Sequence, residues 1–280
     1  MPGRSEDFMG NNNSKPGNGK VLLSCNDLWK IYKKERQDVP VCCNLNFDIY
    51  ENEFLCITGP TGSGKSTILK MIAGLEMPSM GSLTLKGKPI NGPGLDRGMI
   101  FQEYSMLPWR TVYENILLGM EFQKESKKTA REMAMKYVNM VGLGYAKDKY
   151  PWELSGGMKR RTTLAMVLVT NPKILLMDSA FNALDAKTKM TMQMEIVDIW
   201  KKENCTIVFV TSELDEATKL GDRIIVLNSR GEVSKIVKND LPRPRHGKAA
   251  QDSKFLRRFV ELREELFSIL KAGTFKNEVH

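Results

Sequence analysis

A glycine-rich segment at residues 59–67 constrains the fold of this chain more than any other feature. The segment reads Gly59-Pro60-Thr61-Gly62-Ser63-Gly64-Lys65-Ser66-Thr67, which matches the phosphate-loop pattern G-x-x-x-x-G-K-[ST]. An apolar stretch, Phe54–Thr58, precedes it and a helical pattern follows it, as a strand–loop–helix unit requires. Glycines let backbone N–H groups turn inward around an anion, and the helix start adds the positive end of its dipole. The segment therefore predicts a nucleotide-binding site.

Three polar side chains give this predicted site its chemistry. Lys65 would reach the outer phosphates, and the hydroxyl of Ser66 would help to hold Mg²⁺. A metal-orienting carboxylate is expected at the end of another strand. Four apolar residues, Ile174–Met177, predict such a buried strand, and Asp178 follows them directly.

Apolar, strand-like segments alternate with amphipathic helical segments along the rest of the chain. This alternation predicts an α/β fold with a parallel sheet that helices cover on both faces. One helical pattern runs from Val112 to about Val141, and another contains the methionine-rich stretch Met190–Met194. We expect these methionines to pack in the core.

Composition excludes several classes of protein. Hydrophobic residues make up 41% and charged residues 27% of the 280, which is typical of a globular chain. No window has the roughly 18 apolar residues of a membrane helix, and the first residues lack the apolar region of a secretory signal. The net charge of +9 comes without a Lys/Arg block or an RNA-binding motif, so we expect no nucleic-acid partner.

The five cysteines indicate a reducing compartment. They are odd in number and contain no C-x-x-C pair, so they are expected to be free thiols in a reducing cytoplasm.

The chain divides into three predicted segments. Residues 1–20 are polar and predicted to be disordered, residues 21–240 form the main domain, and residues 241–280 form a C-terminal extension. The extension contains an amphipathic helix with Phe255, Phe259, Leu262 and Leu266 on one side. We prefer to interpret it as a helix that docks on the domain surface; the alternative is a regulatory element.

A second short motif gives these features a family context. Leu154-Ser155-Gly156-Gly157-Met158 lies just before a helical pattern, and together with the phosphate loop it makes the chain resemble the ATP-binding subunits of ABC transporters. Gln102 matches the family's Q-loop, and Asn182-Ala183-Leu184-Asp185 matches its D-loop. Residues 92–97, 106–109 and 240–245 resemble the importer branch for nitrate, sulfonate and taurine.

This resemblance implies a fold with a parallel core sheet, an antiparallel β subdomain and an inserted helical subdomain at about residues 103–165. Two subunits would pair head to tail, so that each ATP lies between one phosphate loop and the partner's signature motif, here residues 154–158. Asp185 would lie at the dimer interface, Mg²⁺ would be held by Ser66, Gln102 and Asp178, and Tyr32 would stack on adenine. Tyr32 could instead be an ordinary tyrosine at the end of a strand.

The resemblance also implies partners and a location. The chain would lie peripherally on the cytoplasmic face of the cell membrane. It would drive a transmembrane permease that receives its substrate from a binding protein.

Two positions depart from the family pattern. The family follows its metal-binding Asp with a Glu that polarises the attacking water, whereas Ser179 follows Asp178 here. The family also places a His after the next strand, where this chain has Ser212. Loss of a positioned general base typically costs about 10²–10⁴ in rate. We therefore expect the chain to bind ATP with Mg²⁺ but to hydrolyse it poorly.

Two other interpretations of these positions stay open. Glu213 could substitute as a base, and Ser212 with Asp215 could simply begin a helix. The preferred hypothesis is a heterodimer whose other subunit keeps the Glu and the His. One alternative is an ATP-gated regulatory subunit that restrains a transporter without hydrolysis. Another is a soluble protein of this family that acts on nucleic acid, which the absence of basic blocks and of a second cassette disfavours.

Overall fold

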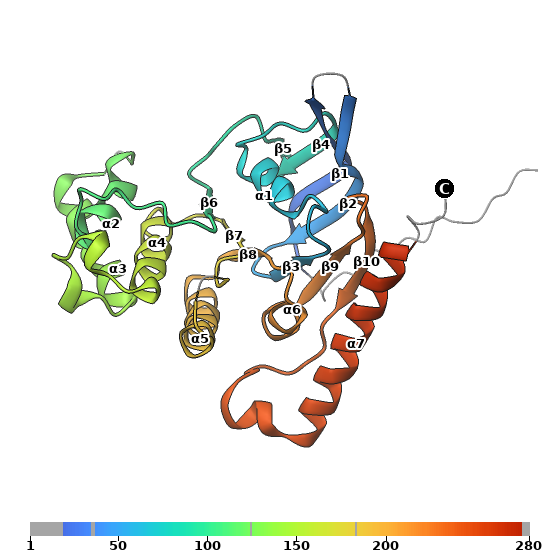
Figure 1. Ribbon diagram of the computed structural model, residues 1–280. Coiled ribbons are helices and arrows are strands. Elements are labelled where there is room, and N and C mark those ends of the chain that lie inside the picture. Colours follow the sequence, from blue (N-terminus) through green and yellow to red (C-terminus); the bar gives the residue numbers. More distant parts are fainter. Residues whose placement is uncertain (1–18, 35–36, 124, 183, 276–280) are drawn as a thin grey trace, which may run out of the picture.

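Ten strands form two sheets in the computed structural model, which describes residues 19–34, 37–123, 125–182 and 184–275. The smaller sheet is antiparallel with the order β2-β1-β4-β5, and the larger has the order β10-β9-β3-β8-β7-β6 (Figure 1). The strands are β1 (Val21–Lys34), β2 (Gln37–Tyr50), β3 (Phe54–Thr58), β4 (Met80–Leu85), β5 (Lys88–Pro89), β6 (Arg97–Ile100), β7 (Ile174–Asp178), β8 (Thr206–Val210), β9 (Arg223–Leu227) and β10 (Val233–Lys238).

The larger sheet is parallel from β9 to β6, and β10 joins it antiparallel to β9. Successive residues of its strands face opposite sides. In β3, Leu55 and Ile57 belong to one core cluster, and Phe54 and Cys56 belong to the other. Burial on both faces explains why these strands are almost continuously apolar.

Helices cover both faces of this sheet. Helix α1 contributes Ile68 and Leu69 to the cluster that also holds residues of β1 and β2, so it packs between the two sheets. Helices α5 and α6 contribute Ile196 and Ala217 to the opposite cluster. The predicted α/β fold with its antiparallel β subdomain is therefore confirmed. The α-helices are α1 (Lys65–Ala73), α2 (Val112–Glu121), α3 (Lys127–Met140), α4 (Gly156–Leu168), α5 (Ala186–Glu203), α6 (Leu214–Leu220) and α7 (Ser253–Phe275), and the short 3₁₀ helices are η1 (Gly144–Ala146), η2 (Pro151–Glu153) and η3 (Gly247–Gln251).

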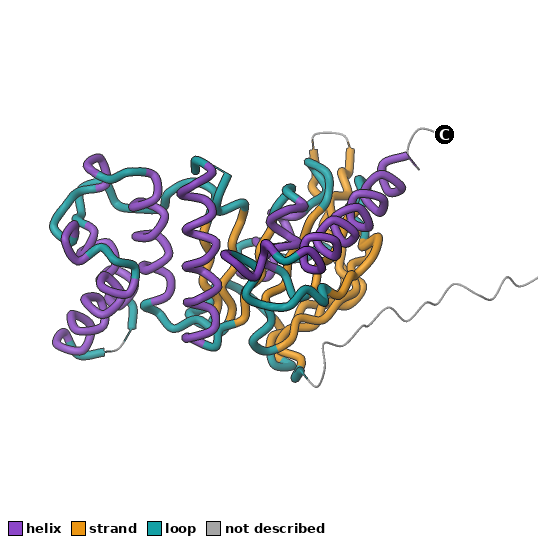
Figure 2. The backbone as a smooth tube through the Cα atoms, turned by 90° about the horizontal axis from the view of Figure 1, so that it is seen from below, coloured by secondary structure: helices purple, strands orange, loops and turns teal. Residues whose placement is uncertain are grey.

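Helices α2, α3 and α4 pack on one another at one end of the molecule, and the strands lie toward the other end (Figure 2). The sequence pattern predicted one helical stretch from Val112 to Val141, and the structure divides it. Helix α2 ends at Glu121, and α3 begins at Lys127 after its N-cap residue Ser126, whose hydroxyl accepts the N–H of Thr129 (3.1 Å). A competing N-cap therefore breaks the helix. The bounds of about 103–165 for a subdomain stay a prediction.

The C-terminal helix α7 docks against α6, β9 and β10. Its apolar side buries Phe255, Leu262 and Leu266 in the core cluster. An ion pair between Arg263 and Asp215 (2.6 Å) joins it to α6. These contacts are those of the expected docking helix. Most of the predicted N-terminal tail, residues 1–18, lies outside the described residues.

The five cysteines are free thiols and all are buried. Burial raises the pKa of Cys42 to about 12 and that of Cys205 to about 11, so these thiols stay protonated near neutral pH. Within the described ranges, no helix combines the length and the hydropathy needed to cross a membrane.

Candidate nucleotide site

The phosphate loop links the fully buried strand β3 to the start of α1. Gly64 takes the N-cap position of α1 with φ 82°. A Cβ at this position would lie 2.6 Å from the carbonyl oxygen of Val41 and 2.8 Å from Sγ of Cys42. Only glycine fits both the conformation and the contact. The close packing holds the helix start, with its unpaired N–H groups, in a fixed position.

Lys65 is folded back onto the loop that carries it. Its Nζ donates to the carbonyl oxygens of Gly59 (2.8 Å) and Pro60 (2.7 Å). Burial lowers the pKa of Lys65, and the nearby Asp178 carboxylate opposes this shift. The loop also holds the hydroxyl of Ser63, which is buried and has no hydrogen-bond partner among the described residues. The Lys65 ammonium, the Ser63 hydroxyl and the N–H groups at the start of α1 are hydrogen-bond donors that suit a phosphate group.

A cavity of about 360 Å³ adjoins the loop. It is lined by Val41, Thr61, Gly62, Gly64, Lys65, Ser66, Thr67, Ser179, Asn182 and Ser212. Ser179 and Ser212 follow the neighbouring parallel strands β7 and β8, and the Ser179 N–H donates to the carbonyl oxygen of Val210 (2.9 Å). The carboxyl ends of parallel strands meet at one edge of the sheet, and this edge is where ligands bind in such folds. Both positions that depart from the family pattern therefore face the phosphate loop.

The side chains at this edge suit a magnesium ion that is bound together with a nucleotide. Among the described residues no group of three or more His, Cys, Asp or Glu side chains could hold a metal ion. Mg²⁺ in nucleotide sites typically takes only one or two carboxylates, with phosphate oxygens and waters as the other ligands. Asp178 ends β7 beside Ser179, and the Ser66 hydroxyl lies in the cavity wall. This donor set fits the ion.

Glu213, the possible substitute base, forms an ion pair with Lys189 instead of facing the cavity. Both of its carboxylate oxygens lie 2.6 Å from Nζ of Lys189 on α5, and Glu213 does not line the cavity. Ser212 does not cap α6, so that expectation is wrong. The hydroxyl of Thr211 accepts the N–H of Glu213 (3.0 Å) and donates to the buried Glu216. The arrangement leaves the Ser212 side chain exposed at the cavity.

The signature residues begin helix α4, away from the phosphate-loop cavity. The Ser155 hydroxyl caps the helix and accepts the N–H of Met158 (3.3 Å), and Leu154 is buried just before it. At Gly157 a Cβ would lie 2.9 Å from Cγ2 of Thr188, so α4 and α5 approach closely here. None of residues 154–158 lines the cavity. The exposed helix start at Gly156 is thus free to face a ligand from another molecule.

Asp185 begins α5 in the same way. Its Oδ1 accepts the N–H of Thr188 (3.0 Å), and hydrogen bonding to Thr188 lowers the pKa of this carboxyl group. Ala183 of the D-loop lies outside the described residues. A role for Asp185 at a dimer interface stays a prediction.

Arg160 is a site residue that the sequence patterns did not reveal. It is 1% exposed, and its guanidinium donates to the carbonyl oxygens of Phe101 (2.8 Å) and Gln102 (2.7 Å). It also lies 4.9 Å from the ring centroid of Tyr104. The signature helix is therefore tied to the backbone at Gln102. The Gln102 side chain is exposed and does not line the cavity.

Tyr32 lies in β1, outside the lining of the phosphate-loop cavity. Its hydroxyl donates to Glu76, and Nζ of Lys30 lies 5.1 Å from its ring centroid. Its stacking on adenine stays a prediction.

A model of the ABC transporter family matches residues 42–182, which run from β2 through the phosphate loop and the signature to the D-loop. The chain belongs to the ABC transporter family. An ABC transporter ATP-binding protein of Methanocaldococcus jannaschii is 44% identical, with 92% of this chain and 94% of the relative covered. The nitrate import ATP-binding protein NrtD of Synechocystis is 39% identical over 89% and 95%. The bicarbonate transport ATP-binding protein CmpD of Synechococcus elongatus is 39% identical over 83% and 84%.

Solved structures of ABC proteins share this fold. An ATP-binding cassette in a dimeric post-hydrolysis state, bound to ADP and Pi, superposes with a TM-score of 0.70 at 31% identity. The comparison covers 78% of this chain and 98% of that one. The cbiO1 protein of Clostridium perfringens gives a TM-score of 0.72 at 24% identity, over 90% and 99% of the two chains.

Proposed function

We propose that this chain is the ATP-binding subunit of an ABC importer, that it binds ATP with Mg²⁺ at its own phosphate loop, and that it hydrolyses this ATP slowly. Its signature residues 154–158 complete the ATP site of a second subunit that keeps the catalytic Glu and His. Binding and hydrolysis of ATP by the two subunits drive a permease. The chain is peripheral on the cytoplasmic face of the membrane.

One observation carries this proposal: Ser179 and Ser212 line the same cavity as Lys65 and Ser66. The groups for holding phosphate and metal are present, whereas neither departing position offers a base at neutral pH. A serine hydroxyl cannot accept the proton of an attacking water as a carboxylate does. The Glu213 carboxylate, which could substitute as a base, is held by Lys189. The signature, in contrast, starts a well-capped helix.

Exposed aromatic side chains support a protein partner for the helical end of the molecule. Trp109, Tyr145 and Trp152 are 69%, 76% and 65% exposed. Trp109 precedes α2, whereas Tyr145 and Trp152 lie in η1 and η2. A backbone hydrogen bond from Val112 N–H to the carbonyl oxygen of Lys149 (2.9 Å) joins these two parts of the chain. Exposed apolar surface of this kind is typical of an interaction site. We assign it to the permease.

The similarity to the nitrate and bicarbonate proteins supports a small anion as the transported substrate. Sulfonate and taurine, suggested by residues 92–97 and 240–245, belong to the same proposal. The permease and its binding protein would select among these anions, because the role proposed for the phosphate-loop cavity of this chain is to bind the nucleotide.

The proposal is tested by measuring Mg–ATP binding and hydrolysis by the full-length chain. We expect saturable binding and hydrolysis near background. Ser179→Glu combined with Ser212→His should raise hydrolysis by about 10²-fold or more. The matched control combines Ser179→Gln with Ser212→Asn, which add similar bulk without a base. Fast hydrolysis by the unaltered chain, or an equal gain in the control, would contradict impaired catalysis. Absence of ATP binding would refute the nucleotide site itself.

The asymmetric pairing needs a separate experiment. The chain would be purified from its native membranes in mild detergent, and the co-purifying proteins would be identified by mass spectrometry. A permease together with a second ATP-binding subunit that carries the Glu and the His is the expected result. A permease with this chain alone would mean a homodimer, and recovery without any permease would refute the transport role.

A further inference from the structure

Ser179, which follows the last residue of β7, has a backbone conformation that serine rarely adopts. Its φ of 46° lies in the left-handed region, where the Cβ of an L-residue comes too close to the following carbonyl oxygen. Asparagine and aspartate tolerate this region better, and they make up most of the other described non-glycine residues with positive φ. Ser179 is the only one of these residues that lines the phosphate-loop cavity. Strained residues of this kind gather at ligand-binding sites.

Hydrogen bonds of the backbone hold Ser179 in this conformation. Its N–H donates to the carbonyl oxygen of Val210 on the neighbouring strand β8 (2.9 Å), and its own carbonyl oxygen accepts the N–H of Asn182 (3.2 Å). The next residue, Ala180, is fully buried and anchors the turn in the core. Glycine would make the same backbone contacts without strain. The backbone alone therefore does not account for a side chain at position 179.

Three polar side chains on this side of the cavity lack a partner. The hydroxyls of Ser179 and Ser212 and the amide of Asn182 line the cavity, and none of them forms a side-chain hydrogen bond within the described part of the chain. Each can donate a hydrogen bond, and none is charged. Ser179 also follows Asp178, the expected ligand of Mg²⁺. Because Mg²⁺ in such sites bridges the outer two phosphates of a nucleotide, the Ser179 hydroxyl lies close to where the terminal phosphate would be bound.

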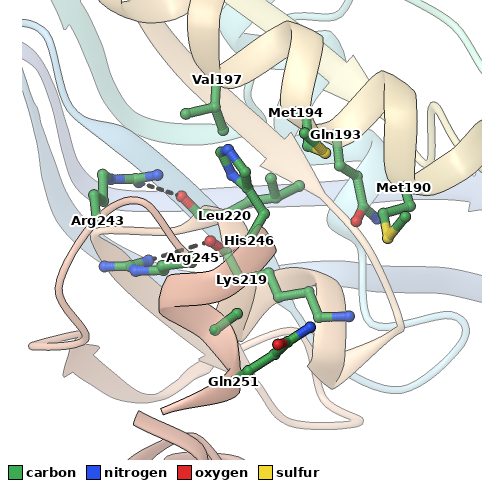
Figure 3. Close-up of a pocket in the computed structure, with 12 residues that line it drawn as sticks. Met190, Gln193, Met194, Val197, Lys219, Leu220, Arg243, Arg245, His246 and Gln251 are labelled. Atoms are coloured by element: carbon green, nitrogen blue, oxygen red, sulfur yellow. Dashed lines mark hydrogen bonds between the residues drawn. The ribbon is translucent and has the colours of Figure 1, made fainter.

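A second pocket, of about 430 Å³, is lined differently (Figure 3). It lies between α5, the end of α6 and η3, and its arginines, Arg243 and Arg245, already donate to backbone carbonyl oxygens at the end of α6. Met190 and Met194 also line it, so the expected core role of the methionine-rich stretch is only partly correct, although Met192 is buried. The two guanidinium groups therefore fix the end of α6 and do not select a ligand for this pocket.

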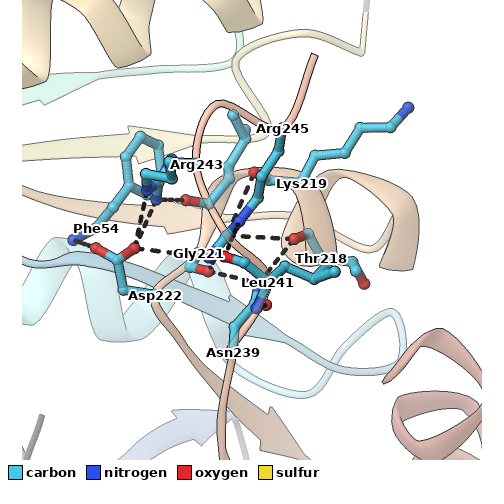
Figure 4. Close-up of polar contacts among 10 residues, drawn as sticks. Phe54, Thr218, Lys219, Gly221, Asp222, Asn239, Leu241, Arg243 and Arg245 are labelled. Carbon is cyan, nitrogen blue, oxygen red and sulfur yellow. Dashed lines mark hydrogen bonds and ion pairs between the residues drawn. The ribbon is translucent and has the colours of Figure 1, made fainter. Parts of the chain in front are cut away.

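Ser212 is held in place because both ends of α6 are fixed. At the start of the helix, Lys189 forms an ion pair (2.6 Å) with Glu213, which follows Ser212 directly. At its end, Arg245 donates to the carbonyl oxygen of Gly221 (2.7 Å), within the network of polar contacts in Figure 4. The Ser212 hydroxyl therefore keeps its position at the cavity, at the end of the strand next to β7.

We infer that the Ser179 hydroxyl, with Ser212 and Asn182 beside it, donates to the terminal phosphate of ATP and makes this site select a nucleoside triphosphate over a diphosphate. The inference rests on the proposed function and adds a binding role for a position that offers no base. Hydrogen bonds to an ionised phosphate are stronger than those between neutral groups, and ADP would lack them at this side chain. This role accounts for a strained serine where glycine would fit without strain.

The test is isothermal titration calorimetry of the full-length chain with Mg²⁺ and either β,γ-imido-ATP, which resists hydrolysis, or ADP. Ser179→Ala should weaken binding of β,γ-imido-ATP by roughly fivefold or more, the loss expected for one hydrogen bond to a charged group. Its affinity for ADP should stay unchanged. Ser82→Ala, the same substitution at an exposed position on β4 outside the cavity, should change neither affinity.

Ser179→Gly separates the hydroxyl from the backbone strain. It removes the hydroxyl but relieves the strain, so it should lose as much affinity for β,γ-imido-ATP as Ser179→Ala does. Its midpoint of unfolding in urea should nevertheless be higher than that of Ser179→Ala, because glycine adopts positive φ without a penalty. A merely structural role of Ser179 predicts instead that the more stable variant also binds the nucleotide better.

Three results would count against the inference. Unchanged β,γ-imido-ATP affinity in both variants, or a loss in only one of them, would overturn it. Equal losses for β,γ-imido-ATP and ADP would also overturn it, because they would indicate a general disturbance of the cavity. An unaltered chain that binds neither nucleotide would refute the proposed nucleotide site itself, and the inference with it.

Discussion

Replacing Arg160 by methionine should destabilise the folded chain by about 3 kcal/mol. The side chain donates to the carbonyl oxygens of Phe101 and Gln102, and hydrogen bonds to a charged group contribute roughly 1.5–3 kcal/mol each. Part of this sum is offset, because the guanidinium is buried and its Nε has no hydrogen-bond partner among the described residues. Methionine keeps most of the apolar stem, so the loss reports mainly on the polar contacts.

The assay is urea unfolding of the full chain, monitored by circular dichroism. The free energies of unfolding of the variants are compared with a common m value, the slope of free energy against urea concentration. Arg161→Met is the matched control on the same helix. Arg161 pairs with Glu195, but both side chains are about one-third exposed, so its loss should cost no more than about 1 kcal/mol. Equal losses in the two variants would refute the view that Arg160 fastens α4 to the Gln102 segment.

Three further outcomes are expected from the structure. Gly64→Ala should weaken Mg–ATP binding at least roughly tenfold, because alanine disfavours the left-handed backbone and its Cβ would meet Val41; an unchanged affinity by calorimetry would contradict the loop geometry. Thr211→Val should cost about 1–3 kcal/mol of unfolding free energy, since the buried Glu216 loses a donor; a stability within error of the unaltered chain would show that water replaces the hydroxyl. Asn239→Ala should cost about 2 kcal/mol in the same assay, because its amide donates to two carbonyls at the end of α6, and a neutral result would mean that this helix end needs no cap.

The sequence predicted those parts of the fold that depend on local pattern. The unit of buried strand, glycine loop and helix at β3 and α1 is written in consecutive residues, and so is the capped start of α4 at Ser155. Strand β7 with Asp178 at its end follows from an uninterrupted apolar run. In each of these cases the residues that determine the structure are neighbours along the chain.

Other features depend on contacts between distant segments, and these were not predictable from one sequence. Strand β10 is half exposed, so its pattern is too weak to distinguish it from a loop until β9 pairs with it. Arg160 contacts a backbone 58 residues away, and Arg245 donates to the carbonyl oxygen of Gly221, 24 residues earlier, at the end of α6. A guanidinium in a sequence indicates a charge, but it does not indicate which carbonyl groups that charge will meet.

The burial of every cysteine has a practical consequence. Alkylating reagents attack the thiolate, and buried thiols with raised pKa values react slowly with them. A cysteine introduced at an exposed position, such as Ser155 or Thr61, would therefore be labelled selectively without removal of the native five. If two subunits pair around ATP as proposed, spin labels at these two positions would report their approach as a distance measured in solution.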